Sequence, residues 1–220
     1  MSKTETYKLN QVEAVLSKLL TASFSQSWSN KEPISGKWKT RIKRLLEIDR
    51  AWGEKNKRRL KEIPMAFYDE LPGGTGNDAE FSPRKVFNLA IACSLLRIGF
   101  KQTETVEYVG IFDAKLRQAF GEAERLTPQT FRTAPDTFLI IVAIEASSRE
   151  EMASKRRIKA GENIPRGSIV TEEELAQSVA EISTGAMQAV GVICLSQTAY
   201  HISQLLPRQE KRNRGRPRLN

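Results

Sequence analysis

The chain has 220 residues, with 35 Lys and Arg against 26 Asp and Glu, a formal charge of +9, and 40% hydrophobic residues. This hydrophobic content is enough to build a sizeable core, so the composition excludes a disordered chain, a collagen-like repeat and a coiled-coil rod. No apolar run approaches the ~20 residues of a membrane span, and the first residues form no apolar signal core, so we expect a soluble cytoplasmic protein.

The positive charge is concentrated in two segments. Residues 31–62 contain 12 Lys and Arg against 5 Asp and Glu, and residues 208–220 contain 6 against 1. The rest of the chain is close to neutral or slightly acidic. This asymmetry favours a polyanionic partner over a general contribution to solubility.

Two helices are predicted before the middle of the chain. Apolar residues at helical spacing predict an amphipathic helix over 8–21, which a Ser-rich connector follows. A second helix is predicted over 35–52, with Gly53 placed to end it. The Lys and Arg residues of this second helix lie off its apolar face, and residues 54–62 extend the positive charge. The second helix is therefore a basic amphipathic helix.

A hairpin is predicted next. Residues 64–69 have the pattern of a short strand, residues 72–78 are rich in Pro and Gly, and residues 79–81 are suited to a returning strand. Pro and Gly are the residues that tight turns favour. The turn would therefore project between two paired strands.

The following helix has signals at both ends. Ser82 is placed as its N-cap, a proline follows at the first helical position, and Gly99 lies just beyond the end. Thr103 is then placed to cap a short helix over 106–111, and Asp113 to cap another after it. The middle of the chain is therefore predicted to be mostly helical.

The C-terminal half alternates strands and helices. Residues 137–144 form a continuous β-prone run that is typical of a buried strand. Thr171 and Glu174 have the spacing of a capping box that opens a helix. Residues 189–195 read as a second strand, and Ser196 is placed to cap a final helix. This order suggests a small α/β unit.

The tail carries an Arg-Gly-Arg-Pro sequence from Arg214 to Pro217. It resembles an AT-hook, a short peptide that binds the minor groove, although Asn213 stands where that motif usually has proline. Gly215 would let the backbone lie on the floor of a groove about 6 Å wide, while the flanking arginines reach along A·T-rich DNA. The alternative is a basic tail that binds any polyanion.

Few residues indicate catalysis or metal binding. His201 is the only histidine, and no nucleophile or orienting carboxylate is evident for it. Cys93 and Cys194 lie in apolar runs without a CxxC partner and read as core residues. The glycine-rich residues 72–76 lack the Gly-Lys-Ser/Thr ending of a phosphate-binding loop. We expect no enzyme activity, no cofactor and no metal ion.

The middle of the chain also carries a family resemblance. An aromatic segment at 66–70, Phe-Ser-Pro-Arg-Lys-Val at 81–86, Leu-Leu-Arg-Ile-Gly-Phe at 95–100 and Thr-Glu-Thr-Val at 103–106 follow one another. Residues 63–112 thereby resemble the second half of a MerR-type winged-helix DNA-binding domain. The resemblance implies a wing, a helix after it, and a Leu-Gly-Phe-like turn into a short helix. The family's long dimerisation helix has no counterpart, because Thr-Pro interrupts the chain at 127–128.

Together these features predict an α+β protein that is predominantly helical. We expect a winged-helix-like DNA-binding domain over 1–126, a linker over 127–136, a small α/β domain for dimerisation or sensing over 137–207, and a disordered basic tail over 208–220. The α/β domain is where a homodimer would form. Its Ile and Val runs are equally consistent with a core and no further role.

The predicted function is that of a DNA-binding transcriptional regulator associated with the nucleoid. The helix over 35–52 would enter the major groove as the second helix of a stretched helix-turn-helix, and the 73–78 turn would act as a wing on double-stranded, A·T-rich DNA. Alternatives are an architectural protein that coats A·T-rich DNA without fixed sites, and an adaptor tethered to DNA. The predicted DNA contacts are Lys37, Lys39, Arg41, Lys43, Arg44, Lys57, Arg58, Arg59, Arg212, Arg214, Gly215, Arg216, Pro217 and Arg218.

Overall fold

The structure is a computed structural model. It describes residues 5–22, 36–57, 64–72, 79–143, 167–183 and 189–206. These residues form seven helices and two small antiparallel sheets, so the predicted α+β, predominantly helical class is confirmed. Within the described ranges, no helix combines the length and the apolar character that crossing a membrane requires.

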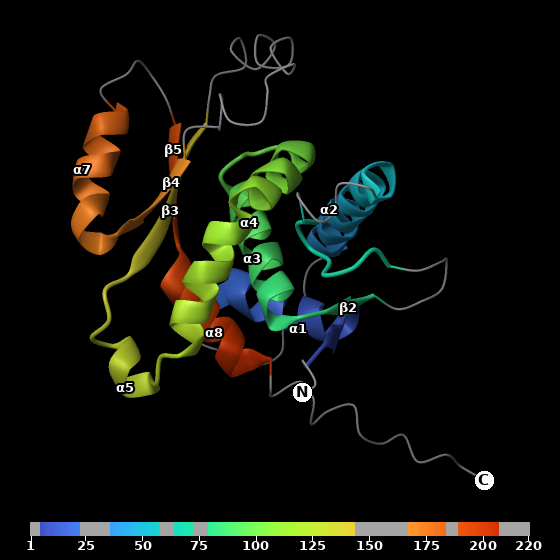
Figure 1. The fold of residues 1–220 in the computed structure, drawn as a ribbon, viewed down its shortest axis with the longest axis horizontal. Helices are drawn as coiled ribbons and strands as arrows, with labels where there is room; N and C mark the ends of the chain where they lie inside the picture. Colours follow the sequence, from blue (N-terminus) through green and yellow to red (C-terminus); the bar gives the residue numbers. More distant parts are fainter. Residues whose placement is uncertain are drawn as a thin grey trace.

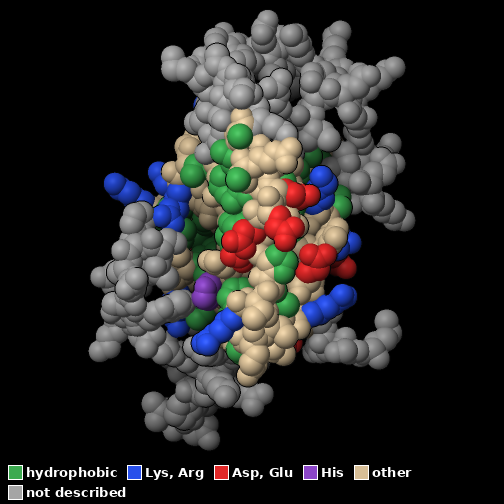
Figure 2. Space-filling model, turned by 90° about the vertical axis from the view of Figure 1, so that its left-hand side faces the viewer, with side chains coloured by type: hydrophobic (Ala, Val, Ile, Leu, Met, Phe, Trp, Pro, Cys, Tyr) green, Lys and Arg blue, Asp and Glu red, His purple; other side chains and the backbone are tan. Residues whose placement is uncertain are grey.

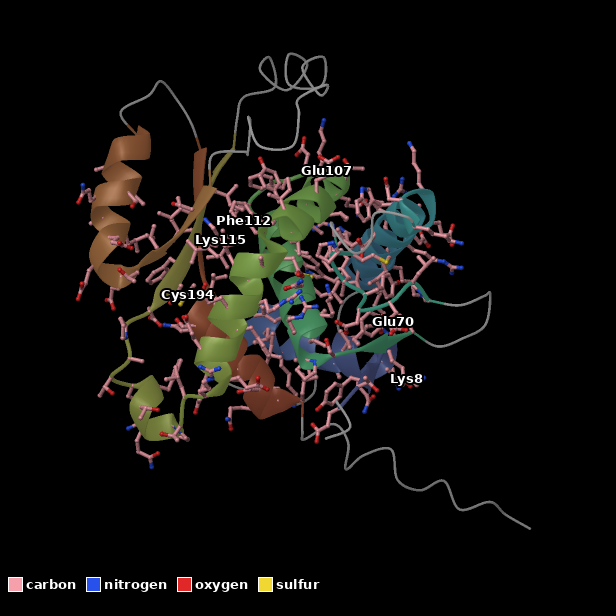
Figure 3. All side chains as sticks on the ribbon, viewed as in Figure 1. Lys8, Glu70, Glu107, Phe112, Lys115 and Cys194 are labelled. Carbon is pink, nitrogen blue, oxygen red and sulfur yellow. The ribbon has the colours of Figure 1, made fainter. Side chains whose placement is uncertain are left out.

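The N-terminal elements are two short strands and two helices. Strand β1 (Tyr7–Lys8) leads into α1 (Leu9–Ala22), and α2 (Gly36–Lys55) follows. Strand β1 pairs antiparallel with β2 (Glu80–Phe81). The ammonium of Lys8, which Figure 3 labels, lies 3.2 Å from the Glu80 carboxylate. The helices predicted over 8–21 and 35–52 are both confirmed.

The predicted hairpin is wrong. Residues 64–69 lie in no strand, and β2 pairs with β1 instead of with them. The physical reason is that the backbone of this segment is bonded to side chains. The Asp49 carboxylate accepts hydrogen bonds from the N–H groups of Ala66 and Phe67, at 2.9 and 2.8 Å. The turn at 73–78 lies outside the described residues.

Helices α3 (Pro83–Arg97) and α4 (Gln102–Glu124) form the centre of the molecule. Ser82 caps α3 as predicted, and Gly99 adopts a φ of +98°, which favours glycine after a helix end. The two short helices predicted after it are wrong, because α4 runs through without a break. Asp113 caps nothing, since its buried side chain binds cations from α3 and from the next turn of α4.

The C-terminal part is built around a three-stranded sheet. Its elements are α5 (Pro128–Phe131), β3 (Thr137–Ala143), β4 (Gly167–Thr171), α7 (Glu172–Ser183), β5 (Ala189–Cys194) and α8 (Leu195–Leu205). The strand order is β4-β3-β5 and both pairings are antiparallel. Strand β4 was not predicted. It lies between β3 and β5 in the chain and pairs with β3. Because both pairings of the sheet are antiparallel, the sheet differs from the parallel sheet that is typical of an α/β unit.

Side-chain bonds at the ends of these elements match the sequence in part. The Glu174 carboxylate accepts the N–H of Thr171 at 3.0 Å, as the capping-box spacing predicted. Ser196 does not cap α8, because the N-cap position is Cys194. Its hydroxyl instead donates to Asp136 at 2.6 Å and accepts from the Thr137 N–H at 3.2 Å, so it ties α8 to the start of β3.

The elements are arranged in layers (Figure 1). Helix α7 covers one face of the sheet, α8 and α3 lie against the other, and α2 is on the far side of α4. Helix α8 also packs on α4 and α1, so the sheet and the helices share one hydrophobic core. Members of this core include Leu16, Ile42, Leu89, Leu116, Ile141 and Ile202. The predicted domain boundaries stay a prediction.

Candidate nucleic-acid interface

The C-terminal half of α2 anchors this helix to the rest of the protein. Gly53 was expected to end the helix, but it lies inside it and is buried. A Cβ atom at Gly53 would lie 2.7 Å from the sulfur of Met65 and 3.1 Å from a methyl group of Leu71. Glycine is therefore needed for the close approach of the following segment, and the helix continues to Lys55.

Asp49 provides the polar part of this anchor. Its side chain is 1% exposed, on the same face of α2 as Ile42 and Leu45. Burial raises the pKa of this carboxyl, and the hydrogen bonds from Phe67 and Ala66 oppose the increase. Because the two N–H groups have this carboxylate as their acceptor, the segment after α2 is held against the helix.

The same segment is held from the other side by a buried charge cluster. We use this name for Arg84, Lys85 and Asn88 of α3 together with Asp113 and Arg117 of α4. Lys85 donates from Nζ to the carbonyl oxygens of Met65 and Ala66, at 2.5 and 3.4 Å, and Asn88 donates to Ala66 at 2.8 Å. The peptide groups around Ala66 are thus bonded to both α2 and α3.

Asp113 is the centre of the buried charge cluster. One oxygen lies 2.6 Å from Arg84, 3.2 Å from Lys85 and 3.1 Å from the Asn88 amide nitrogen, and the other lies 3.1 Å from Arg117. Burial alone would raise the pKa of this carboxyl, but Lys85 and Arg84 outweigh it and hold the pKa below its ordinary value. Burial, with Arg84 nearby, lowers the pKa of Lys85. The two fully buried charges of the cluster, those of Lys85 and Asp113, therefore compensate each other.

The first half of α2 is different, because its cations are exposed. The basic half of α2, residues 36–46, contains no acidic residue. Its exposed cations are Lys37, Lys39, Arg41, Lys43 and Arg44. Cations in the first turn of a helix oppose the positive end of its dipole, so helix stability does not explain Lys37 and Lys39.

Only part of this positive charge has a partner within the described residues. The Lys39 ammonium lies 3.9 Å from the Glu13 carboxylate of α1, and the Arg41 guanidinium lies 5.1 Å from the centre of the Trp38 ring. Lys37, Lys43 and Arg44 form no ion pair with any residue that the structure describes. Within the part of the chain that the structure describes, these three cations therefore lack a carboxylate partner.

Helical spacing arranges the exposed cations in rows. Lys37 and Arg41 follow one another at an interval of four residues, as do Lys39 and Lys43, while Arg44 lies between these two rows beside Thr40. Residues three and four apart are neighbours on a helix surface. The basic half of α2 therefore presents one row of cations on each side of the exposed line through Thr40.

The structure places six of the predicted contacts. Lys57, just beyond α2, is exposed like the five cations of the basic half. The remaining predicted contacts lie outside the described residues and are Arg58, Arg59, Arg212, Arg214, Gly215, Arg216, Pro217 and Arg218. Sequence reasoning did not single out Glu47, an exposed acid that shares the outer face of α2 with Thr40. The seven-residue interval between Thr40 and Glu47, two helical turns, could have placed Glu47 on this outer face from the sequence alone.

The packing of α2 differs from the predicted helix-turn-helix. The main packing partner of α2 is α4, whereas α1 packs against α8 and α3. The Lys39–Glu13 ion pair joins α1 to α2. Helix α2 is therefore positioned by α4 and by residues 64–72, and α1 does not support it in the way that the first helix of a compact helix-turn-helix supports the second.

The surroundings of Cys93 and His201 do not favour catalysis. Burial raises the pKa of the Cys93 thiol to about 12, which makes it a poor nucleophile, and burial lowers the pKa of the half-buried His201. Among the described residues, no three His, Cys, Asp or Glu side chains are grouped so that they could hold a metal ion. No family model matches the chain, and no curated protein matches it either.

Proposed function

We propose that the protein is a transcriptional regulator that binds double-stranded DNA through the basic half of α2. The observation that carries this proposal is the pair of cation rows on a half-helix without acidic residues. A helix fits into the major groove, where phosphates of the two strands lie on either side of it. One row would face each strand.

The way in which α2 is held supports this orientation. Asp49 and Gly53, in its second half, fix the helix to residues 64–72, while its first half extends from this anchor with exposed side chains. In helix-turn-helix proteins it is also the N-terminal residues of the recognition helix that contact base edges. A rigid anchor at one end gives the other end a fixed register on the duplex.

The distribution of acidic residues supports the same direction of approach. Glu172, Glu173 and Glu174, in the first turn of α7, are all exposed. Helix α7 and α2 lie at opposite sides of the molecule, and acidic side chains gather on the face that Figure 2 shows, with α7 in front. Phosphates would be repelled from the α7 side and attracted to the α2 side.

The winged-helix and AT-hook resemblances supply the finer parts of the proposal. Residues 64–72, which pack on α2 through Met65 and Leu71, lead directly into residues 73–78. A wing formed there would contact DNA beside α2. The arginines of the tail would add minor-groove contacts, and tethering on one chain raises the effective concentration of this second site.

Titration of fluorescent duplexes at physiological salt tests this function. A regulator should bind one duplex, selected from a random pool, well above a scrambled version with the same base composition. An architectural protein would follow A·T content alone. An adaptor would lose DNA affinity but keep its protein partner when residues 208–220 are removed. No retardation of any duplex would refute the proposal.

A further inference from the structure

The exposed face of α2 carries an acidic residue, Glu47. DNA phosphates would repel its negative charge, so its presence on a DNA-binding helix needs an explanation. Thr40, Arg44, Glu47 and Ala51 succeed one another at helical intervals and are all exposed. The opposite face is buried and includes Ile42, Leu45, Leu46, Asp49 and Gly53. The first four residues therefore form the central exposed line of α2, between the two rows of cations.

Two exposed acids on α2 differ in their pairing. Glu54 accepts a hydrogen bond from Arg50 at 3.0 Å, so its charge is compensated within the helix. Glu47 has Lys43 four residues before it and Arg44 three residues before it, yet no described residue forms an ion pair with it. Among the described residues, its carboxylate on the central line therefore has no cation that compensates it.

An uncompensated carboxylate is costly on a surface that approaches phosphates. The cost is offset where the carboxylate accepts a hydrogen bond from a base edge, and in the major groove glutamate accepts from the N4 amino group of cytosine. The position of Glu47 suits this contact, because the central line of a helix in the groove faces the base edges while the rows at its sides face the phosphates.

We infer that Glu47 is a specificity-determining residue that reads a cytosine in the major groove. This inference rests on the proposed function and deepens it. Glu47 takes the N4–H of the cytosine as donor, and a thymine at the same position offers only an O4 acceptor, which repels the carboxylate. Arg44, one turn earlier on the same line, lies over a neighbouring base pair.

Glu47→Ala and the matched control Glu54→Ala test the inference. Each variant removes one exposed acid from the same helix. The probe is the best duplex that the wild-type chain selects from a pool with a random central region, together with its scrambled version. We expect Glu47→Ala to bind the scrambled duplex more tightly, because a repulsive charge is gone. We also expect it to lose about tenfold or more of the preference for the selected duplex.

Repeating the selection with the variants locates the effect. Glu47→Ala should return the same consensus except at one C·G pair, whereas Glu54→Ala should return it unchanged. An unaltered consensus and preference for Glu47→Ala would overturn the inference while leaving the proposed function standing. Absence of any selected sequence with the wild-type chain would instead overturn both. Unfolding midpoints equal to the wild-type value would show that the exposed substitutions leave the fold intact.

Discussion

The buried charge cluster and the basic half of α2 contain the same kinds of side chain in opposite circumstances. Lys85 is 1% exposed and has Asp113 and two carbonyl oxygens as partners. Lys43 is exposed and forms no ion pair with any described residue. A buried cation needs its own carboxylate, because desolvation is otherwise too costly, whereas an exposed one needs none.

This difference separates cations that hold the fold from cations that are free for a partner. The buried charge cluster joins α3, α4 and the segment after α2. Its charged side chains therefore form their interactions within the protein. Most of the positive charge in the basic half of α2 has no acidic partner among the described residues. Substitutions in the first group should change stability, and substitutions in the second should change DNA binding.

The largest expected effect is that of Asp113→Ala. The substitution leaves Lys85 buried without a counter-charge, which costs about 3–5 kcal/mol of unfolding free energy. Urea unfolding followed by circular dichroism measures it. Arg117→Ala is the control, because Arg117 is 61% exposed and its pair with Asp113 should contribute at most about 1 kcal/mol. Equal effects of the two substitutions would contradict the division into two groups.

Removing one cation from each row of α2 should have the next largest effect. We expect the double variant Lys37→Ala, Lys43→Ala to bind DNA about tenfold more weakly and to lower the salt slope of binding by about 2. Its unfolding free energy should stay within about 0.5 kcal/mol of wild type. Lys115→Ala is the matched control, since this exposed lysine lies on the side of α4 away from α2 (Figure 3).

Acid should weaken the buried charge cluster. Because the pKa of Asp113 is lower in the folded than in the unfolded protein, its contribution is complete above the unfolded value and is lost as pH falls through the folded one. The difference in unfolding free energy between wild type and Asp113→Asn should therefore narrow from about pH 5 downward. Urea midpoints of both proteins across this range measure it, and a constant difference would contradict the expected titration.

The smallest expected effect concerns Glu13 of α1, which forms an ion pair with a lysine in the basic half of α2. Lys39 belongs to the basic half of α2 but lies 3.9 Å from Glu13. Since Lys39 keeps 47% of its side chain exposed, Glu13→Ala should change the unfolding free energy by less than about 0.5 kcal/mol. It should slightly strengthen DNA binding by freeing this lysine. Weaker binding would show that Glu13 positions Lys39 instead of competing for it.

Local patterns in the sequence predicted α1, α2 and α3. The apolar spacing of α1, α2 and α3, together with Ser82 and Gly99, depends on neighbours within a few residues. The same holds for the cation rows of α2, because helical spacing alone arranges them. The central line with Glu47 could have been found in the same way, by asking which exposed residue lies opposite the buried face.

The errors arose where distant residues decide the structure. Asp49 bonds to backbone groups 17 and 18 residues away, and Asp113 pairs with a lysine 28 residues away. No local pattern distinguishes such carboxylates from exposed ones or from helix caps. Strand β4 was missed for a related reason, because it is five residues long, includes Gly and Ser, and gains its partner only when β3 lies beside it.

The peptide groups at Ala66 and Phe67 have a kinetic consequence. They belong to no helix or strand, yet both amide N–H groups donate hydrogen bonds to the buried Asp49 carboxylate. The Ala66 carbonyl accepts a hydrogen bond from Asn88 of α3. Solvent reaches such amides when the hydrogen bonds between residues 64–72 and α2 open. In hydrogen–deuterium exchange this irregular stretch should behave like a core helix, and its opening would report the release of α2.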